Sequence, residues 1–335
     1  MKFGVGIPTC TAGMMYPTPF ASVAEVVDIA LEAEQLGYYE VTGNDHYTTP
    51  RYVRDSFSLP PDFFEPLITH AYIAAQTSVL RLMTGVLVFP MRQPVLLAKQ
   101  LATLDQLSGG RVIVGAGTGA YREEFERALP HLAGGNRGRL MDETMAAVRL
   151  LLSECSATFH GEYLAFESVE MFPKPVQDPL PIYSAGNAEA SIRRAALYGQ
   201  GWLPAAVAPA TIRAGKERLA VYAEEAGRGE VDFQIAPQLM VCMADTQDAA
   251  ERTFTSSHLY RHLVTLQQST LKDIDSNSFV ANNLVGTPDL VSAKVAEFRD
   301  AGVGHLCGIY FAANEVDDLR DQMRRFAAQV MPGFG

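Results

Sequence analysis

Short, continuously apolar segments alternate with longer amphipathic segments along almost the whole chain. A segment that is apolar at every position is typical of a strand in a parallel sheet, because both faces of such a sheet are buried. Eight segments of this kind are predicted as strands, at residues 3–7, 39–42, 82–89, 112–116, 181–185, 201–204, 233–243 and 305–311.

The segments between these strands have helical periodicity. In residues 22–36 the apolar positions recur at the spacing of one helix face, and Gly37 follows as a helix-ending residue. Residues 157–166 are predicted as a small hairpin that turns at Gly161, residues 123–135 as irregular, and residues 246–283 as a long polar segment. Helices are predicted at 22–36, 66–76, 94–107, 137–153, 188–197, 210–226, 288–301 and 317–330.

This alternation predicts an α/β fold, a (β/α)8 TIM barrel with insertions after strands 4 and 7. The chain has 335 residues, a size that one such barrel reaches. It shows no internal repeat, low-complexity tract or linker, so we expect a single domain over residues 1–335.

Composition narrows the function classes. Hydrophobic residues make up 48% of the chain and charged residues 19%, which is enough apolar material for one large core. The net charge of −11 argues against nucleic acid or an anionic membrane as a partner. No apolar run approaches the roughly 20 residues of a membrane-spanning helix. The N-terminal segment is too short and too glycine-broken for a signal peptide, so a cytoplasmic protein is expected.

Cysteine and histidine spacing predicts no metal site. The four cysteines are far apart in the sequence, which fits reduced thiols better than disulfides or a metal cluster. His258 and His262 have helical i, i+4 spacing but no glutamate of an H-E-x-x-H motif between them.

A glycine-rich turn follows the fourth predicted strand. The β-branched run 112–114 leads into Gly115, Gly117 and Gly119, and glycine lets the backbone approach a ligand closely. Residues 115–120 also fit the dinucleotide fingerprint G-x-G-x-x-A, but that motif normally follows the first strand of a Rossmann domain. The remaining alternatives are a phosphate-binding turn and a tight turn without a ligand.

The carboxyl ends of barrel strands form the site in this fold, and here they are mostly apolar or aromatic. They carry one imidazole, His46, and a second glycine turn at Gly186-Asn187 leads into a helix N-terminus that suits a phosphate. This arrangement favours a flat, conjugated, phosphorylated cofactor. The candidate substrate pocket consists of Met14, Tyr16, Phe89, Trp202, Gln238 and Tyr310.

Five segments resemble the bacterial luciferase-like superfamily and occur in the order expected for it. These are residues 41–46 (VTGNDH), 84–88, 101–111, 137–143 and 300–306. The pair Asp45-His46 is more similar to the branch that uses the deazaflavin coenzyme F420 than to the monooxygenases that use reduced flavin mononucleotide (FMN).

The resemblance implies roles for individual residues. His46 would give a proton to the reduced product or take one from an alcohol, a task that suits imidazole. Asp45 would fix the tautomer of His46 or contact the cofactor. The bond between Gly85 and Val86 matches a bulge, often with a cis peptide, that supports the cofactor ring. The residues that match the phosphate-binding backbone are Gly117, Thr118, Gly119, Ala185, Gly186 and Asn187.

The function expected from the resemblance is hydride transfer from reduced F420 to a C=C, C=N or C=O group, or the reverse oxidation. Sugar-phosphate dehydrogenases of this branch carry a glutamate directly after the G-T-G turn, where this chain has Ala120, which argues against sugar-phosphate oxidation. The apolar residues predicted around the mouth favour a larger or less polar substrate. The alternatives are a two-component FMN-dependent monooxygenase that uses O2 and a protein that only stores a flavin.

Partners expected on the same basis are a small-molecule or peptide substrate and an F420 reductase or flavin reductase as the source of reductant. A homodimer is also expected. The amphipathic helix at 137–153 either packs on the barrel or contributes to the dimer interface.

Overall fold

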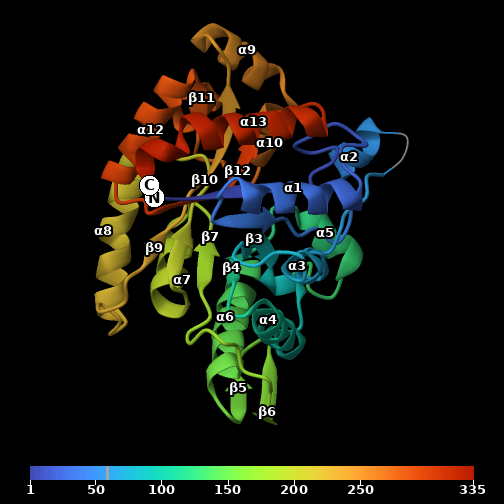
Figure 1. Cartoon of the computed structure of the whole chain (residues 1–335). Helices are drawn as coiled ribbons and strands as arrows, with labels where there is room; N and C mark the ends of the chain where they lie inside the picture. Colours follow the sequence, from blue (N-terminus) through green and yellow to red (C-terminus); the bar gives the residue numbers. More distant parts are fainter. Residues whose placement is uncertain (58–59) are drawn as a thin grey trace.

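The computed structural model describes residues 1–57 and 60–335 and shows strands and helices in alternation (Figure 1). The strands are β1 (Lys2–Gly6), β2 (Glu40–Gly43), β3 (Arg81–Val88), β4 (Val112–Gly117), β5 (Ala157–His160), β6 (Ala165–Val169), β7 (Ile182–Ala185), β8 (Gly201–Leu203), β9 (Gln234–Ile235), β10 (Gln238–Met243), β11 (Leu284–Gly286) and β12 (His305–Phe311).

Helices connect most of these strands. They are α1 (Val23–Gln35), α2 (Arg51–Ser56), α3 (Pro66–Ala74), α4 (Pro94–Ser108), α5 (Arg122–Ala128), α6 (Arg137–Ser153), α7 (Glu189–Tyr198), α8 (Pro209–Glu225), α9 (Gln247–Ser256), α10 (His258–Leu266), α11 (Phe279–Asn282), α12 (Pro288–Asp300) and α13 (Val316–Gln329). Short 3₁₀ helices lie at Phe89–Met91, Ser276–Ser278 and Met331–Phe334.

Within the described residues, all strands except the β5–β6 hairpin form one parallel sheet, in the order β11-β10-β12-β1-β2-β3-β4-β7-β8-β9. The sheet curls until its two ends meet. The amide of Gln238 in β10 donates to the carbonyl of Pro204 just after β8 (2.8 Å), and Ala206 donates back to Gln238 (3.0 Å). The fold is TIM-barrel-like, and the predicted fold class is confirmed.

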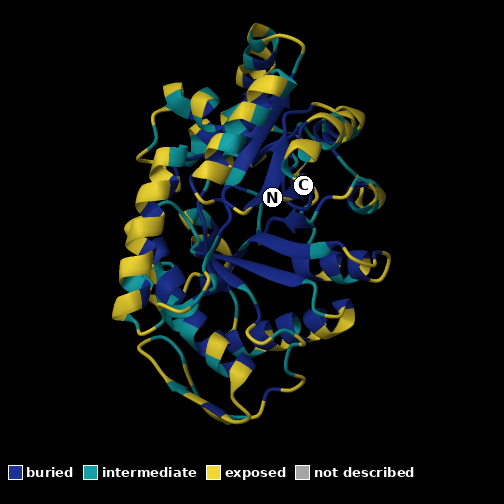
Figure 2. Ribbon diagram, turned by 60° about the vertical axis from the view of Figure 1, so that its left-hand side comes forward, coloured by how far each residue is buried: buried dark blue, intermediate teal, exposed yellow. Residues whose placement is uncertain are grey.

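Hydrophobic burial explains this architecture. Every residue of β4 and β12 is buried, as expected for strands covered on both faces. The helices bury one face against the sheet and expose the other, so the buried strands lie inside a shell of half-exposed helices (Figure 2). Both ends of the chain lie together, because the N-terminal ammonium of Met1 donates to the carbonyl of Phe334 (2.6 Å).

One glycine in β1 sets the position of an aromatic ring beneath the site. A Cβ atom on Gly6 would lie 2.2 Å from the ring of Tyr310, so only glycine leaves room for that ring. The hydroxyl of Tyr310 then reaches Oδ1 of Asn44, at a distance of 2.7 Å. This contact ties β12 to the end of β2.

Both predicted insertions are present. Residues 118–181, after β4, carry α5, α6 and the β5–β6 hairpin, and residues 244–304, after β10, carry α9, α10, α11, β11 and α12. None of the helices in the described ranges combines the length and apolar character needed to cross a bilayer.

Two local predictions were wrong. Residues 123–135 were expected to be irregular but contain α5. The strand expected at 233–243 is two strands, because Pro237 has no amide hydrogen for the ladder and separates β9 from β10. The polar segment 246–283, for which no helix was predicted, contains three α-helices, and Leu259, His262 and Leu263 form a buried stripe at helical spacing in α10.

Candidate functional site

The candidate site is a cavity of about 160 Å³ at the carboxyl ends of β2, β3, β4 and β7. Ten of the sequence-predicted site residues line it, and Met15, Asn44 and residues of α10 lie beside them. The predicted residues in this lining are Asp45, His46, Gly85, Val86, Gly117, Thr118, Gly119, Ala185, Gly186 and Gln238.

Five residues predicted to line the substrate pocket do not line this cavity. Met14, Tyr16, Phe89, Trp202 and Tyr310 are buried in the core, because large apolar surfaces are most stable there. Met15 lines the cavity in place of its neighbour Met14.

One of these core residues supports the site. The indole N–H of Trp202 donates to the carbonyl of Gly186 (2.8 Å), which holds the second glycine turn. Tyr16 stacks on Phe20 with ring centroids 4.1 Å apart, a contact of the core.

His46 makes its closest side-chain contact with Glu124. Nδ1 of His46 lies 3.1 Å from Oε2 and 3.3 Å from Oε1 of Glu124, and the side chains are 11% and 1% exposed. The amide of Thr48 donates to the same carboxylate (3.4 Å). Nε2 of His46 makes no hydrogen bond within residues 1–57 and 60–335, so this nitrogen is left for a ligand.

Sequence reasoning missed Glu124, because it lies in the segment expected to be irregular. The signal was the run Arg122–Ala128, which forms α5 and places Glu124 in its first turn facing inward. Aromatic rings complete the surroundings: the rings of Phe63 and Tyr121 each lie 5.7 Å from the imidazole of His46.

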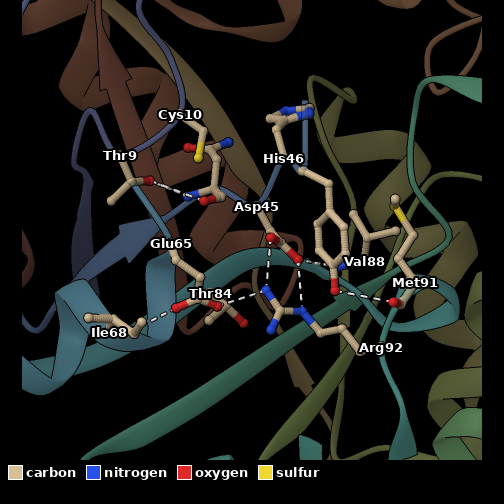
Figure 3. Close-up of polar contacts among 12 residues, drawn as sticks. Thr9, Cys10, Asp45, His46, Glu65, Ile68, Thr84, Val88, Met91 and Arg92 are labelled. Carbon is tan, nitrogen blue, oxygen red and sulfur yellow. Dashed lines mark hydrogen bonds and ion pairs between the residues drawn. The ribbon is translucent and has the colours of Figure 1, made fainter. Parts of the chain in front are cut away.

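Of the two roles predicted for Asp45, a hydrogen bond to His46 is absent within the described residues, whereas contact with the cofactor stays a prediction, since Asp45 lines the cavity. Its carboxylate binds Arg92 through two hydrogen bonds, Nη2 to Oδ1 at 2.9 Å and Nε to Oδ2 at 3.1 Å. The amide of Val88 also donates to Oδ2 (3.0 Å). The carboxylate of Asp45 and the imidazole of His46 point in opposite directions (Figure 3). A guanidinium is the stronger partner for a buried carboxylate, which explains this arrangement.

Arg92 also binds a second acid, Oε1 of Glu65, at 2.8 Å. Glu65 precedes α3 and accepts the amide of Ile68 (2.8 Å), so it acts as the cap of that helix. The ion pairs therefore join the end of β2, the 3₁₀ helix after β3 and the start of α3.

The support expected for a cofactor ring is present at the end of β3. The peptide bond between Gly85 and Val86 is cis. The side-chain amide of Asn44 donates to the carbonyl of Gly85 (3.2 Å), and its backbone amide donates to Oγ1 of Thr9 (2.8 Å). Asn44, which links β1, β2 and β3, was not predicted as a site residue.

A second, outer cavity of about 580 Å³ continues from the first. Both cavities are lined by Thr118, Gly119, Ala120, Ala185, Gly186 and Thr270. The charged residues in the outer lining are Arg137, Lys272, Asp273 and Asp275, so its formal charges cancel.

The two glycine turns meet between these cavities. Gly119 has φ +82° and Gly186 has φ +119°, and both values favour glycine. Arg137 donates to the carbonyl of Gly119 (3.0 Å). Ala188, the residue before α7, gives that helix no side-chain cap, so the amides of Glu189 and Ala190 remain for an anion, whereas the amide of Ser191 donates to the carbonyl of Ala188 (2.8 Å).

One buried polar atom fits a ligand in the inner cavity. Nε2 of Gln238 has no hydrogen-bond partner among the described residues. Gln238 lines the cavity beside Gly85, and a buried amide without a partner costs free energy unless a ligand or water completes it. The residues present therefore fit a polar, planar cofactor. No group of three or more His, Cys, Asp or Glu residues arranged for a metal occurs in the described ranges.

Hydrogen bonds between three aromatic residues form a roof over this cavity. The hydroxyl of Tyr52 in α2 lies 3.2 Å from that of Tyr121, which precedes α5, and 3.2 Å from Nδ1 of His262 in α10. Burial lowers the pKa of His262 to about 3, with a further contribution from His46. Tyr121 and His262 line the cavity, whereas Tyr52, which contacts both, does not.

Comparisons with known proteins place this geometry in context. A family model described as luciferase-like monooxygenase matches residues 1–305. The chain is 28% identical over 330 residues to an F420-dependent glucose-6-phosphate dehydrogenase of Kineococcus radiotolerans, covering 92% of each protein. It is 24% identical over 355 residues to an FMNH(2)-dependent dimethylsulfone monooxygenase of Pseudomonas fluorescens, covering 99% of this chain and 94% of the relative.

Solved structures share the fold. The monooxygenase RslO1 from Streptomyces bottropensis has a TM-score of 0.78 and 24% identity, with full coverage of both chains. An F420-dependent secondary alcohol dehydrogenase in complex with an F420-acetone adduct has a TM-score of 0.78 and 18% identity, covering 98% of each chain.

Proposed function

Because the chain belongs to the luciferase-like monooxygenase family, we propose that it is an oxidoreductase that uses reduced F420 for hydride transfer to a C=C, C=N or C=O group of a fairly apolar substrate, or the reverse oxidation. The family includes F420-dependent and FMN-dependent oxidoreductases, so the choice of cofactor is the specific part of the proposal.

The contact between His46 and Glu124 carries this proposal. When F420 is bound, it supplies or accepts a hydride, and a carbonyl that gains a hydride also needs a proton. His46 lies at the cavity with Nδ1 on the Glu124 carboxylate, which favours the tautomer with the proton on Nδ1 and stabilises the imidazolium. Nε2 then gives a proton to the developing alkoxide, or takes one from an alcohol in the reverse direction.

The backbone around the two glycine turns would hold the phosphate. The amides of Thr118 and Gly119 lie where both cavities meet, and that of Asn187 lies in the outer cavity next to the uncapped start of α7. The amide of Gly186 already donates to the carbonyl of Leu203 (3.0 Å), so Gly186 would contribute through its backbone conformation. The pair Gly85-Val86 and the amide of Gln238 would contact the ring.

The inner cavity disfavours a sugar phosphate as the substrate. No lysine or arginine side chain belongs to its described lining, so a second phosphate, on the substrate, would have no cationic side chain to bind there. We therefore propose a neutral, less polar substrate than that of the Kineococcus relative.

A two-component FMN-dependent monooxygenase is the second candidate. The outer cavity favours it, because two basic and two acidic side chains leave no net positive charge for a tail with several carboxylates. A cofactor with a single phosphate and few other charges suits such a lining.

A fluorescence-quench titration of the purified protein with oxidised F420 and, separately, with FMN tests the proposal. Micromolar or tighter binding of F420 alone supports hydride chemistry. A preference for FMN instead supports the two-component monooxygenase, which activates oxygen and needs a partner reductase. His46→Ala should keep F420 binding and lose turnover, and unchanged turnover would remove His46 from the mechanism.

A further inference from the structure

The roof of the inner cavity contains a short hydrogen-bonded chain, Tyr121–Tyr52–His262. Each of its two contacts is 3.2 Å long. Its two ends, Tyr121 and His262, line the cavity, whereas its middle member does not. Because both ends lie in the cavity, the direction of the hydrogen bonds decides which end presents a proton donor to a ligand.

Counting the protons of these three side chains shows that one of the two ends presents an N–H or O–H to the cavity. Each tyrosine hydroxyl has one proton, and a neutral imidazole has one N–H. If Tyr121 donates to Tyr52 and Tyr52 donates to Nδ1 of His262, the proton of His262 is on Nε2 and faces the cavity. If the direction reverses, the hydroxyl proton of Tyr121 faces the cavity instead. In both cases the chain offers one donor at one end and one acceptor at the other.

The side chains of Tyr121, Tyr52 and His262 are uncharged near neutral pH. Burial lowers the pKa of His262 to about 3 and raises the pKa of Tyr52 to about 12. Burial also raises the pKa of Tyr121 well above its usual range, with Tyr52 contributing. Near the contact between His46 and Glu124, the roof therefore supplies a neutral donor.

The other charged groups near the cavity already have partners. The carboxylate of Asp45 binds Arg92, and that of Glu124 binds His46. No carboxylate in the described lining is left for a cationic imine, and no lysine or arginine side chain there would accept an anion. A neutral group with lone pairs is the ligand that this lining matches.

We infer that His262, held by Tyr52 and Tyr121, donates a hydrogen bond from Nε2 to a neutral oxygen of the substrate, and that the substrates are ketones, enones or secondary alcohols rather than imines. The inference rests on the proposed function and makes His262 the group that orients the substrate. In the reduction, the carbonyl carbon gains the hydride that reduced F420 supplies, and its π bond is replaced by a C–H and an O–H bond. The O–H proton comes from His46, so the carbonyl is reduced by two electrons and F420 is oxidised by two.

Two lone pairs on one oxygen make these roles compatible. One lone pair accepts the hydrogen bond of His262 while the other receives the proton of His46. His262 lies in α10 and His46 follows β2, so the two imidazoles belong to different parts of the chain. Removal of His262 should therefore impair substrate binding more than proton transfer.

The first test locates the proton of His262 by NMR and does not depend on any cofactor. In protein labelled with 15N-histidine, long-range proton–nitrogen correlations should show His262 as a single neutral tautomer with the proton on Nε2, unchanged between pH 5 and 8. Tyr52→Phe should convert this signal into a mixture of tautomers. A proton on Nδ1 in the unmodified protein would overturn the assignment of His262 as the donor.

The second test measures turnover with reduced F420 and three probes, cyclohexanone, cyclohex-2-enone and the imine 1-pyrroline. Turnover of a carbonyl probe and not of the imine is expected. His262→Phe should raise KM for the carbonyl roughly tenfold while kcat changes less, and His262→Gln, which keeps a donor, should stay within about threefold. His258→Phe, the same change four residues earlier in α10, is the matched control and should leave KM unchanged.

The outcomes separate this inference from the proposed function. A protein that binds F420 but turns over only the imine, or neither carbonyl, contradicts the inference and leaves the F420-dependent activity to another substrate class. A protein that fails to bind F420 contradicts the proposed function, and the NMR result still decides whether His262 presents a donor.

Discussion

Nδ1 of His46 lies 3.1 Å from Oε2 of Glu124, although 78 residues separate them in the sequence. His46 follows β2, and Glu124 is in the first turn of α5, in the insertion after β4. The contact is almost completely buried, so its charge and its geometry act on the imidazole with little screening by water.

Glu124→Gln should lower kcat by about 10²-fold, because an amide keeps a hydrogen bond to Nδ1 but does not stabilise an imidazolium. Binding of the cofactor, measured by fluorescence quenching, should stay within about twofold. The matched control is Glu123→Gln, since Glu123 accepts the amide of Arg51 beside the site and does not contact His46. Equal kcat values for the two variants would contradict the role of Glu124.

Gly119→Ala should weaken cofactor binding at least tenfold. Gly119 has φ +82°, and an added Cβ would lie 2.9 Å from Cγ1 of Val88 and 3.1 Å from Cε2 of Phe125, so the turn would have to shift. Gly37 has the same φ of +82° with nothing within 4 Å of its Cβ position, which makes Gly37→Ala the control for backbone strain alone. Both variants should lose about 1 kcal/mol of stability from strain, and only Gly119→Ala should lose binding.

Replacing only one partner of the Asp45–Arg92 ion pair should lower the stability of the fold strongly. The side chains are 2% and 8% exposed, so Arg92→Met leaves a buried carboxylate without its partner, at a cost of about 3–5 kcal/mol in the free energy of unfolding.

Chemical denaturation of Arg92→Met, of Asp45→Asn and of the double variant Asp45→Asn/Arg92→Met measures the coupling energy between the two side chains. The double variant should be less destabilised than the sum of the single changes. Arg122→Met removes the exposed pair with Glu126 and should cost less than about 1 kcal/mol. Additive single changes would show that the two buried groups do not depend on each other.

Stability should fall as the pH is lowered below the ordinary histidine pKa. Burial lowers the pKa of His70 and lowers that of His262 to about 3, so the unfolded chain binds protons that the folded chain does not. Stability is fully present above pH 6.5 and is lost toward pH 3. His262 alone should account for about 2 kcal/mol between pH 6.5 and pH 5.

Unfolding by denaturant at pH 7 and pH 5 measures this loss. His262→Phe should reduce the difference between the two pH values, whereas His160→Phe should not, because His160 is on the exposed β5–β6 hairpin. A difference that is the same in both variants would show that other groups cause the acid sensitivity.

The sequence predicts the barrel well because each strand is buried on both faces and each long helix has one apolar face. Continuous apolar runs such as β4 and β12 therefore stand out without any tertiary information. The short elements do not stand out in this way, because α2, with six residues, and β11, with three, bury too few residues to give a periodic signal.

The site was only partly predictable for a different reason. Strand-end residues such as His46, Gly85 and Gly117 follow from the barrel rule, which places every strand end at the same mouth. Glu124, Tyr52 and His262 come from the connections, whose path depends on packing between distant segments. The resemblance implied that Asp45 fixes the tautomer of His46 or contacts the cofactor, but the Asp45 carboxylate points away from the imidazole and binds Arg92.

The roof has a consequence for the exchange of loops between relatives. Loops of a TIM barrel can usually be altered one at a time, because each is anchored at its own strand. Here Tyr52 follows β2, Tyr121 follows β4 and His262 follows β10, and each hydrogen bond needs two of these connections to be correctly placed. A single transplanted loop would leave buried hydroxyl or imidazole groups without partners. Recombination that preserves folding must therefore exchange the connections after β2, β4 and β10 together. These three loops are expected to diversify jointly and not one at a time.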